Sequence, residues 1–90
     1  MNFIENSLCN LPIGKSATVS ELTCAGDLRR RMMDLGIVPG TVIRALHRSP
    51  SGDPAAYSVL GSVIAIRDSD ASKIFIKVGL SENEPFKHKK

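Results

Sequence analysis

The sequence predicts a mainly β protein, a small closed or partly open barrel of about five short strands with one short helix between the first two. Three observations support this fold class. Short runs of alternating apolar residues recur along the chain, turns rich in Gly and Pro separate them, and one segment near residue 30 has helical periodicity instead. Because closure removes exposed sheet edges, strands this short favour a barrel over an open sheet.

The composition is that of one globular domain. The chain has 90 residues, of which 42% are hydrophobic, 23% charged and 4% aromatic, so aliphatic and methionine side chains must fill the core. Cys9 and Cys24 lie far apart without a CxxC context, which indicates two reduced thiols. The sequence has no signal-peptide pattern and no apolar run of membrane-spanning length. It therefore predicts a cytoplasmic protein without direct membrane insertion.

The first part of the chain leads to the predicted helix. Residues 1–10 have no clear period, and we expect an irregular leader there. Residues 11–14 form a turn signal that opens the domain, and residues 17–20 alternate as a half-buried strand does.

One helix is predicted just after residue 26. Leu28, Met32 and Leu35 follow the i, i+4, i+7 spacing of a buried stripe, and Asp27 is the expected N-cap. Gly36 stands where a left-handed residue would end the helix. A helix this short needs tertiary packing to be stable.

Two turns are expected to follow this helix. Ile37 would complete a Schellman motif by packing back on Met32. Pro39 and Gly40 suit the two central positions of a type II turn, after which the chain leaves as a strand.

The second half of the chain predicts four strands joined by short connections. The expected elements are a strand at 41–47, a loop at 49–54, a strand at 55–60, a turn at 61–62, a strand at 63–67, one helical turn at 68–73 capped by Asp68 or Ser69, and a strand at 74–78. Residues 79–90 are polar and basic, and we expect a disordered tail.

Four segments in this order resemble the FeoA family, the small cytosolic proteins of bacterial ferrous iron uptake. They are Gly14–Val19, Leu28–Thr41, Ser49–Pro54, and Gly61–Arg67 followed by Ala71. The string Asp-Leu-Gly-Ile-x-Pro-Gly-Thr within the second segment is the most specific of these matches. The resemblance implies an SH3-like barrel domain at residues 11–78, which agrees with the strand count reached from the residues alone.

The resemblance also implies an accessory role. FeoA-like proteins act with FeoB, a membrane permease of ferrous iron with a cytosolic GTP-binding domain, and we expect this chain to bind that domain. The same barrel occurs in iron-dependent repressors, so an interaction module of a metal-dependent repressor system is an alternative. The chain has no P-loop and no nucleophile beside a base in a known signature, and we expect neither catalysis nor a cofactor.

The sequence has no clear pattern for metal binding or for nucleic-acid binding. Cys9, Cys24, His47 and His88 lack the close spacing of metal ligands, so no metal site is predicted. The net charge of +3 is compatible with a small barrel that binds nucleic acid, which remains an alternative. The four aromatic residues, however, are scattered and do not form a stacking platform, so we expect no nucleic acid among the partners.

Two surfaces are candidates for protein interaction. The first is the outward face of the helix, formed by Arg29, Arg30, Met33 and Asp34. With the helix starting after Asp27, arginines occupy its first turn and Asp34 its last, the reverse of what the helix dipole favours. Helix stability then does not explain these charges, and contact with a partner would. The alternative is a solvated face on which Arg29 or Arg30 pairs within the chain.

The second candidate surface is the loop after the second predicted strand. It comprises Ser49, Pro50, Ser51, Gly52, Asp53 and Pro54. Loops held rigid at both ends commonly carry recognition residues. The alternative is that these residues serve turn formation alone.

Overall fold

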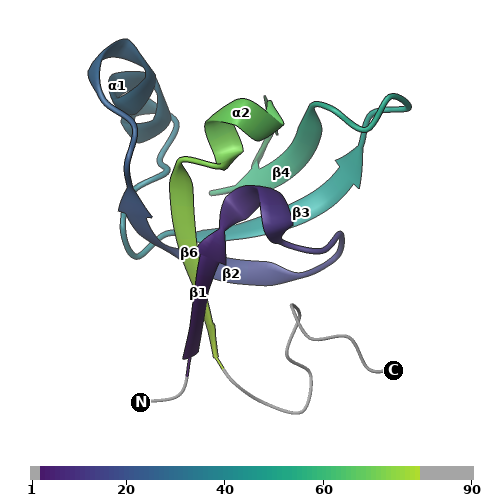
Figure 1. Ribbon diagram of the computed structural model, residues 1–90, viewed down its shortest axis with the longest axis horizontal. Coiled ribbons are helices and arrows are strands. Elements are labelled where there is room, and N and C mark those ends of the chain that lie inside the picture. The colour runs from purple at the N-terminus through teal and green to yellow at the C-terminus, as the bar shows by residue number, and fades with distance from the viewer. Residues whose placement is uncertain (1–2, 80–90) are drawn as a thin grey trace.

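The computed structural model describes residues 3–79 as one twisted antiparallel sheet with three short helical segments (Figure 1). The strands are β1 (Phe3–Ser7), β2 (Ser16–Leu22), β3 (Val42–Arg48), β4 (Ala55–Val59), β5 (Ser62–Ile66) and β6 (Ile74–Gly79). The helical segments are η1 (Leu8–Asn10), α1 (Gly26–Asp34) and α2 (Asp68–Ala71). Both α-helices lie at the same end of the molecule (Figure 1). The predicted mainly β class is confirmed.

The sheet has six strands in the order β1-β6-β2-β3-β4-β5. β2 bends at a bulge between Val19 and Glu21, and β3 has a second irregularity between Ala45 and His47. Such bulges increase the local twist and curve a sheet. Thr18 pairs with Val42 of β3 and with Lys77 of β6, so β2 joins the two halves of the sheet.

The expectation of an irregular leader at residues 1–10 is wrong for the part of it that the structure describes. Residues 3–7 form β1, which pairs with β6 from Phe3–Gly79 to Ser7–Phe75, and residues 8–10 form η1. Leu8 is completely buried. β1 forms its hydrogen bonds with a strand about 70 residues away in the sequence, so no local sequence pattern predicts β1. The tail expected at residues 79–90 starts one residue too early, because Gly79 is the last residue of β6, and residues 80–90 lie outside the described residues.

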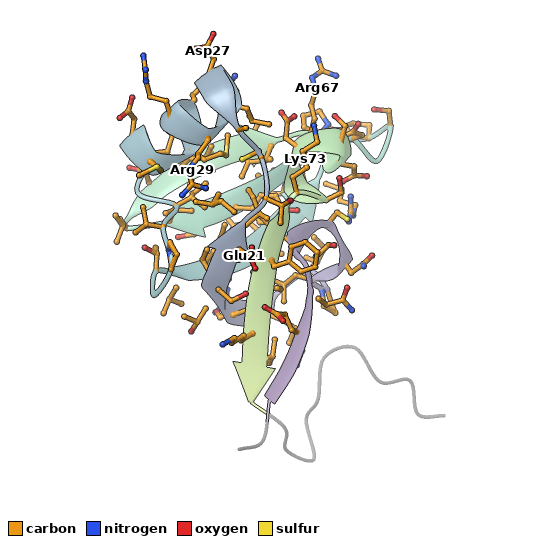
Figure 2. The ribbon with its side chains drawn as sticks, turned by 60° about the vertical axis from the view of Figure 1, so that its left-hand side comes forward. Glu21, Asp27, Arg29, Arg67 and Lys73 are labelled. Carbon is orange, nitrogen blue, oxygen red and sulfur yellow. The ribbon has the colours of Figure 1, made fainter. Side chains whose placement is uncertain are left out.

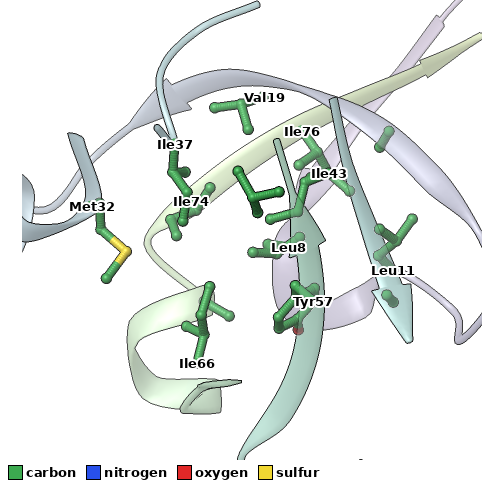
Figure 3. Packing of buried hydrophobic residues seen from close by; sticks show 14 of the residues in the cluster. Leu8, Leu11, Val19, Met32, Ile37, Ile43, Tyr57, Ile66, Ile74 and Ile76 are labelled. Atoms are coloured by element: carbon green, nitrogen blue, oxygen red, sulfur yellow. The ribbon is translucent and has the colours of Figure 1, made fainter. Parts of the chain in front are cut away.

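The core is aliphatic, as the composition predicts. Figure 3 labels Leu8, Leu11, Val19, Met32, Ile37, Ile43, Tyr57, Ile66, Ile74 and Ile76, all buried. Alternate residues of β2 and β4 point inward, whereas no polar or charged residue within 3–79 is buried. α1 contributes Met32, and Leu28 and Leu35 pack partly buried against the same cluster. The predicted apolar stripe of the helix is confirmed.

The end of α1 forms the predicted Schellman motif. Gly36 has φ +91°, its N–H donates to the Met33 carbonyl at 3.0 Å, and the Ile37 N–H donates to the Met32 carbonyl at 2.9 Å. The type II turn follows, with Gly40 at φ +98° and the Thr41 N–H donating to the Val38 carbonyl at 3.0 Å. These two turns direct the chain from the helix into β3.

Three local predictions are wrong. The helix begins at Gly26, so Asp27 lies in its first turn and Ala25 is the N-cap residue. α2 has Arg67 in the N-cap position, with no side-chain cap from Asp68 or Ser69. The β4–β5 turn is Leu60–Gly61 rather than 61–62, because Val59 pairs with Ser62. Within residues 3–79, no helix has the length and apolar character needed to cross a bilayer.

Candidate interaction surfaces

The first candidate surface lies on α1. Arg30, Met33 and Asp34 are exposed, with Met33 at 45%. Arg29 has a different role, because its guanidinium donates a hydrogen bond of 3.0 Å to the Leu22 carbonyl at the end of β2. Figure 2 shows the Arg29 side chain on the strand side of the helix, opposite Asp27. Arg29 therefore fastens α1 to the sheet, and the outward set is reduced to the other three residues.

The charges of α1 fit its dipole better than the sequence analysis expected. The helix starts at Gly26, so Asp27 occupies the first turn and Arg31 the last. Both placements are favourable. Only the charge of Asp34, at the C-terminal end, is placed unfavourably relative to the helix dipole. Helix stability is therefore compatible with most of the charges on α1, and the arginines give little evidence of contact with a partner.

The second candidate surface, the loop at 49–54, is stabilised by hydrogen bonds within the loop and to α2. The Ser49 N–H donates to the Pro54 carbonyl at 3.0 Å, and the Gly52 N–H donates to the Ser49 carbonyl at 2.8 Å. The Ser51 hydroxyl donates to the Asp53 carbonyl at 3.0 Å. One Asp53 carboxylate oxygen accepts the Asp68 N–H at 2.9 Å, at the start of α2. Turn chemistry therefore accounts for most of this loop, and Asp53 holds it against α2.

Arg48 is a residue that sequence reasoning missed. At the end of β3, its guanidinium donates to the Gly52 carbonyl at 3.0 Å, to the Asp68 carboxylate at 3.2 Å and to the Cys9 carbonyl at 3.0 Å. One side chain thereby joins the loop, α2 and η1. The sequence feature that could have pointed to this role is the position of Arg48 directly before a Pro- and Gly-rich loop. A guanidinium group has several donors in a fixed plane, so it can bind several acceptors at once. Its partners, however, lie far apart in the sequence.

Two protonatable groups near Arg48, the Cys9 thiol and the Tyr57 phenol, have raised pKa values. Burial raises the pKa of the Cys9 thiol, and the nearby Asp68 carboxylate raises it further. Burial also raises the pKa of Tyr57 to about 12. Both groups therefore stay protonated at neutral pH, and a protonated thiol is a poor nucleophile. Among the described residues, no three His, Cys, Asp or Glu side chains gather in a way that could hold a metal ion.

Comparison with known proteins decides the family. The model of the FeoA domain matches residues 6–78, which is most of the chain. The chain belongs to the FeoA family. The matched region includes the end of β1 and extends to β6.

Relatives and solved structures agree with this assignment. A Fe(2+) transport protein A/Fe(2+) transporter FeoB fusion protein of Porphyromonas gingivalis is 28% identical over 71 residues, which is 79% of this chain but 8% of the relative. The solution structure of the FeoA protein of Chlorobium tepidum has a TM-score of 0.78 and 31% identity, and covers 88% of this chain and 76% of that one.

The SH3-like fold is also shown by a solved FeoA. The zinc complex of Stenotrophomonas maltophilia FeoA, described as a prokaryotic SH3 domain protein, has a TM-score of 0.71 and 26% identity over 81% of this chain and 95% of that one. The IdeR protein of T. acidophilum has a TM-score of 0.72 at 23% identity, over 82% of this chain and 34% of that one. This second likeness shows the fold alone.

Proposed function

We propose that this chain is a cytoplasmic accessory protein of ferrous iron uptake that acts by binding the cytosolic GTP-binding domain of a FeoB-type permease. Family membership supports the role in ferrous iron transport. The observation that carries the proposed partner is the Porphyromonas gingivalis relative, which is named as a fusion of transport protein A with the transporter FeoB.

A fusion has a physical consequence for the separate protein. Two modules in one chain meet at a high effective concentration, set by the linker, so even a weak contact is populated. A separate chain lacks this advantage. Its contact surface must then supply enough affinity by itself. We therefore expect this surface to include exposed side chains that the fold does not need.

The proposal is tested by titrating the full chain with the isolated GTP-binding domain of the permease from the same genome, by calorimetry. We expect saturable binding. A parallel titration with the full-length permease in detergent distinguishes two failures. Binding to the permease alone would place the contact outside the GTP-binding domain, and binding to neither would contradict the proposed function.

Variants assign the contact to one of the two candidate surfaces. Arg30→Glu reverses a charge on the outward face of α1, and Pro50→Lys alters an exposed residue of the loop. Asp53 is unsuitable as a probe because its carboxylate holds α2. If both variants bind as well as the unmodified chain, neither surface is the interface. The same samples, titrated with single-stranded oligonucleotides, test the nucleic-acid alternative.

A further inference from the structure

The β4–β5 turn contains a residue that suits neither its backbone nor its exposure. Leu60 has φ +51° and Gly61 has φ +84°, so both central residues of this two-residue turn are left-handed. Such type I′ turns favour Asn, Asp or Gly, because other side chains are strained at positive φ. Leu60 is also 74% exposed. Neither turn geometry nor burial therefore explains a leucine here.

Leu60 lies against the end of α1. A Cβ atom built on Gly36 would lie 3.4 Å from Leu60 Cγ, and closer still to Leu60 Cδ1. The Gly36 N–H donates to the Met33 carbonyl, which keeps the last helical turn beside this contact. Val42 begins β3 opposite the turn, because the next residue, Ile43, pairs with Val59. The end of α1 and the start of β3 therefore both lie at the tip of the β4–β5 hairpin.

Exposed apolar side chains concentrate at this place. Within residues 5–78, five large hydrophobic residues are exposed, and four of them lie in these segments or directly after the turn: Met33 at 45%, Val42 at 59%, Val63 at 67% and Leu60 at 74%. We call these four residues the tip surface. The fifth, Ile13 at 46%, lies before β2. Scattered exposed hydrophobics are normal, but a contiguous group commonly marks an interaction site.

The surroundings of the tip surface carry an excess of positive charge. Arg30 precedes Met33 by one helical turn, and Arg44 follows Val42 by two residues on the same side of β3. Both arginines are exposed, and neither has a salt bridge to another of the described residues. Asp34 is the acidic neighbour on α1. The arrangement fits a partner whose apolar surface is flanked by carboxylates.

We propose that the tip surface is the contact for an apolar, acid-flanked surface on the cytosolic part of the permease. This inference rests on the proposed function and assigns its contact to residues that the candidate surfaces only partly include. In this proposal Leu60 is the main contact residue, and Met33, Val42 and Val63 come from the end of α1, the start of β3 and the start of β5. The strained turn is then retained because the leucine is needed for binding.

The decisive variant is Leu60→Asn, because asparagine accepts positive φ better than leucine does. We expect the variant to be folded, with a melting temperature equal to or above that of the unmodified chain, and to bind the GTP-binding domain at least about tenfold more weakly. Ile13→Asn is the control, since it removes an exposed apolar side chain that lies outside the tip surface. It should change the affinity less than about twofold.

A second pair of variants tests the charge argument. Arg44→Gln should weaken binding and reduce its dependence on salt concentration, whereas Lys15→Gln should do neither. If the unmodified chain binds and Leu60→Asn binds equally well, the inference is overturned while the proposed function stands. If the unmodified chain binds neither the GTP-binding domain nor the full-length permease, both the inference and the proposed function are overturned. If Leu60→Asn only converts a dimer to a monomer, the surface is a self-contact and the inference also fails.

Discussion

Arg48 shows how one side chain can hold a small fold together. Its guanidinium donates to carbonyls of the loop and of η1 and to a carboxylate of α2, three segments that lie far apart in the sequence. The side chain is 34% exposed, so its ion pair with Asp68 is partly screened and the carbonyl contacts matter most. A lysine has one ammonium group and cannot span three acceptors in this way.

Replacement of Arg48 by lysine should therefore destabilise the protein by about 1 kcal/mol, measured as the free energy of unfolding in urea. Arg67→Lys is the control, because Arg67 is exposed and points into solvent (Figure 2). It should change stability by less than about 0.5 kcal/mol. Equal stability of the two variants would show that Arg48 does not join these segments in solution.

Tyr57 gives the fold a defined sensitivity to alkaline pH. Its pKa is raised from 10.0 to about 12, mainly by burial. The unfolded chain therefore loses the phenol proton first as pH rises. The stabilisation, up to about 2 kcal/mol, is fully present below pH 10 and is lost as pH rises through 12.

The check is the free energy of unfolding as a function of pH for the unmodified chain and for Tyr57→Phe. The phenylalanine variant should show a shallower loss of stability between pH 10 and 12, since it has no phenol to ionise. Lysine titration contributes equally to both proteins and cancels in the difference. Parallel curves would contradict a raised Tyr57 pKa.

At the scale of elements, the local sequence pattern predicts α1 and the turns at its C-terminal end correctly. The apolar stripe, the left-handed Gly36 and the Pro39–Gly40 turn depend on residues within a few positions of one another, so the sequence displays them directly. The start of the helix was placed too late because Asp27 is a good N-cap type. That small error reversed the interpretation of the helix charges.

β1 is the element that the sequence did not predict. Phe3–Ser7 has no alternation, and its partner β6 is at the other end of the domain. The two-residue β4–β5 turn was displaced by one position, because glycine and serine at 61–62 are better turn formers than a leucine. Both errors concern features that tertiary contacts decide.

The contribution of the N-terminal segment can be measured with Leu8→Ala. Leu8 is completely buried, so the substitution should cost about 2–5 kcal/mol in the free energy of unfolding. Ile13→Ala, at a side chain that is 46% exposed, should cost less than about 0.5 kcal/mol. If both substitutions cost equally little, the segment before residue 11 would be a dispensable leader after all.

At the scale of the whole molecule, the family and fold class followed from the sequence, but the tip surface did not. Met33, Val42 and Leu60 come from three segments that only the folded chain brings together. The predicted surfaces were each drawn from one continuous segment, α1 or the loop at 49–54. Much of both proved to serve the fold, through the hydrogen bonds of Arg29 and Asp53.

The central claim is that the chain binds the permease through the tip surface. The most direct test is a map of backbone amide chemical shifts in the isotopically labelled chain, recorded while the unlabelled GTP-binding domain is added. We expect the largest changes at Gly36, Val42, Leu60 and Val63, with small changes in the loop at 49–54. Largest changes in that loop with an unaltered tip surface, or no changes anywhere, would contradict the claim.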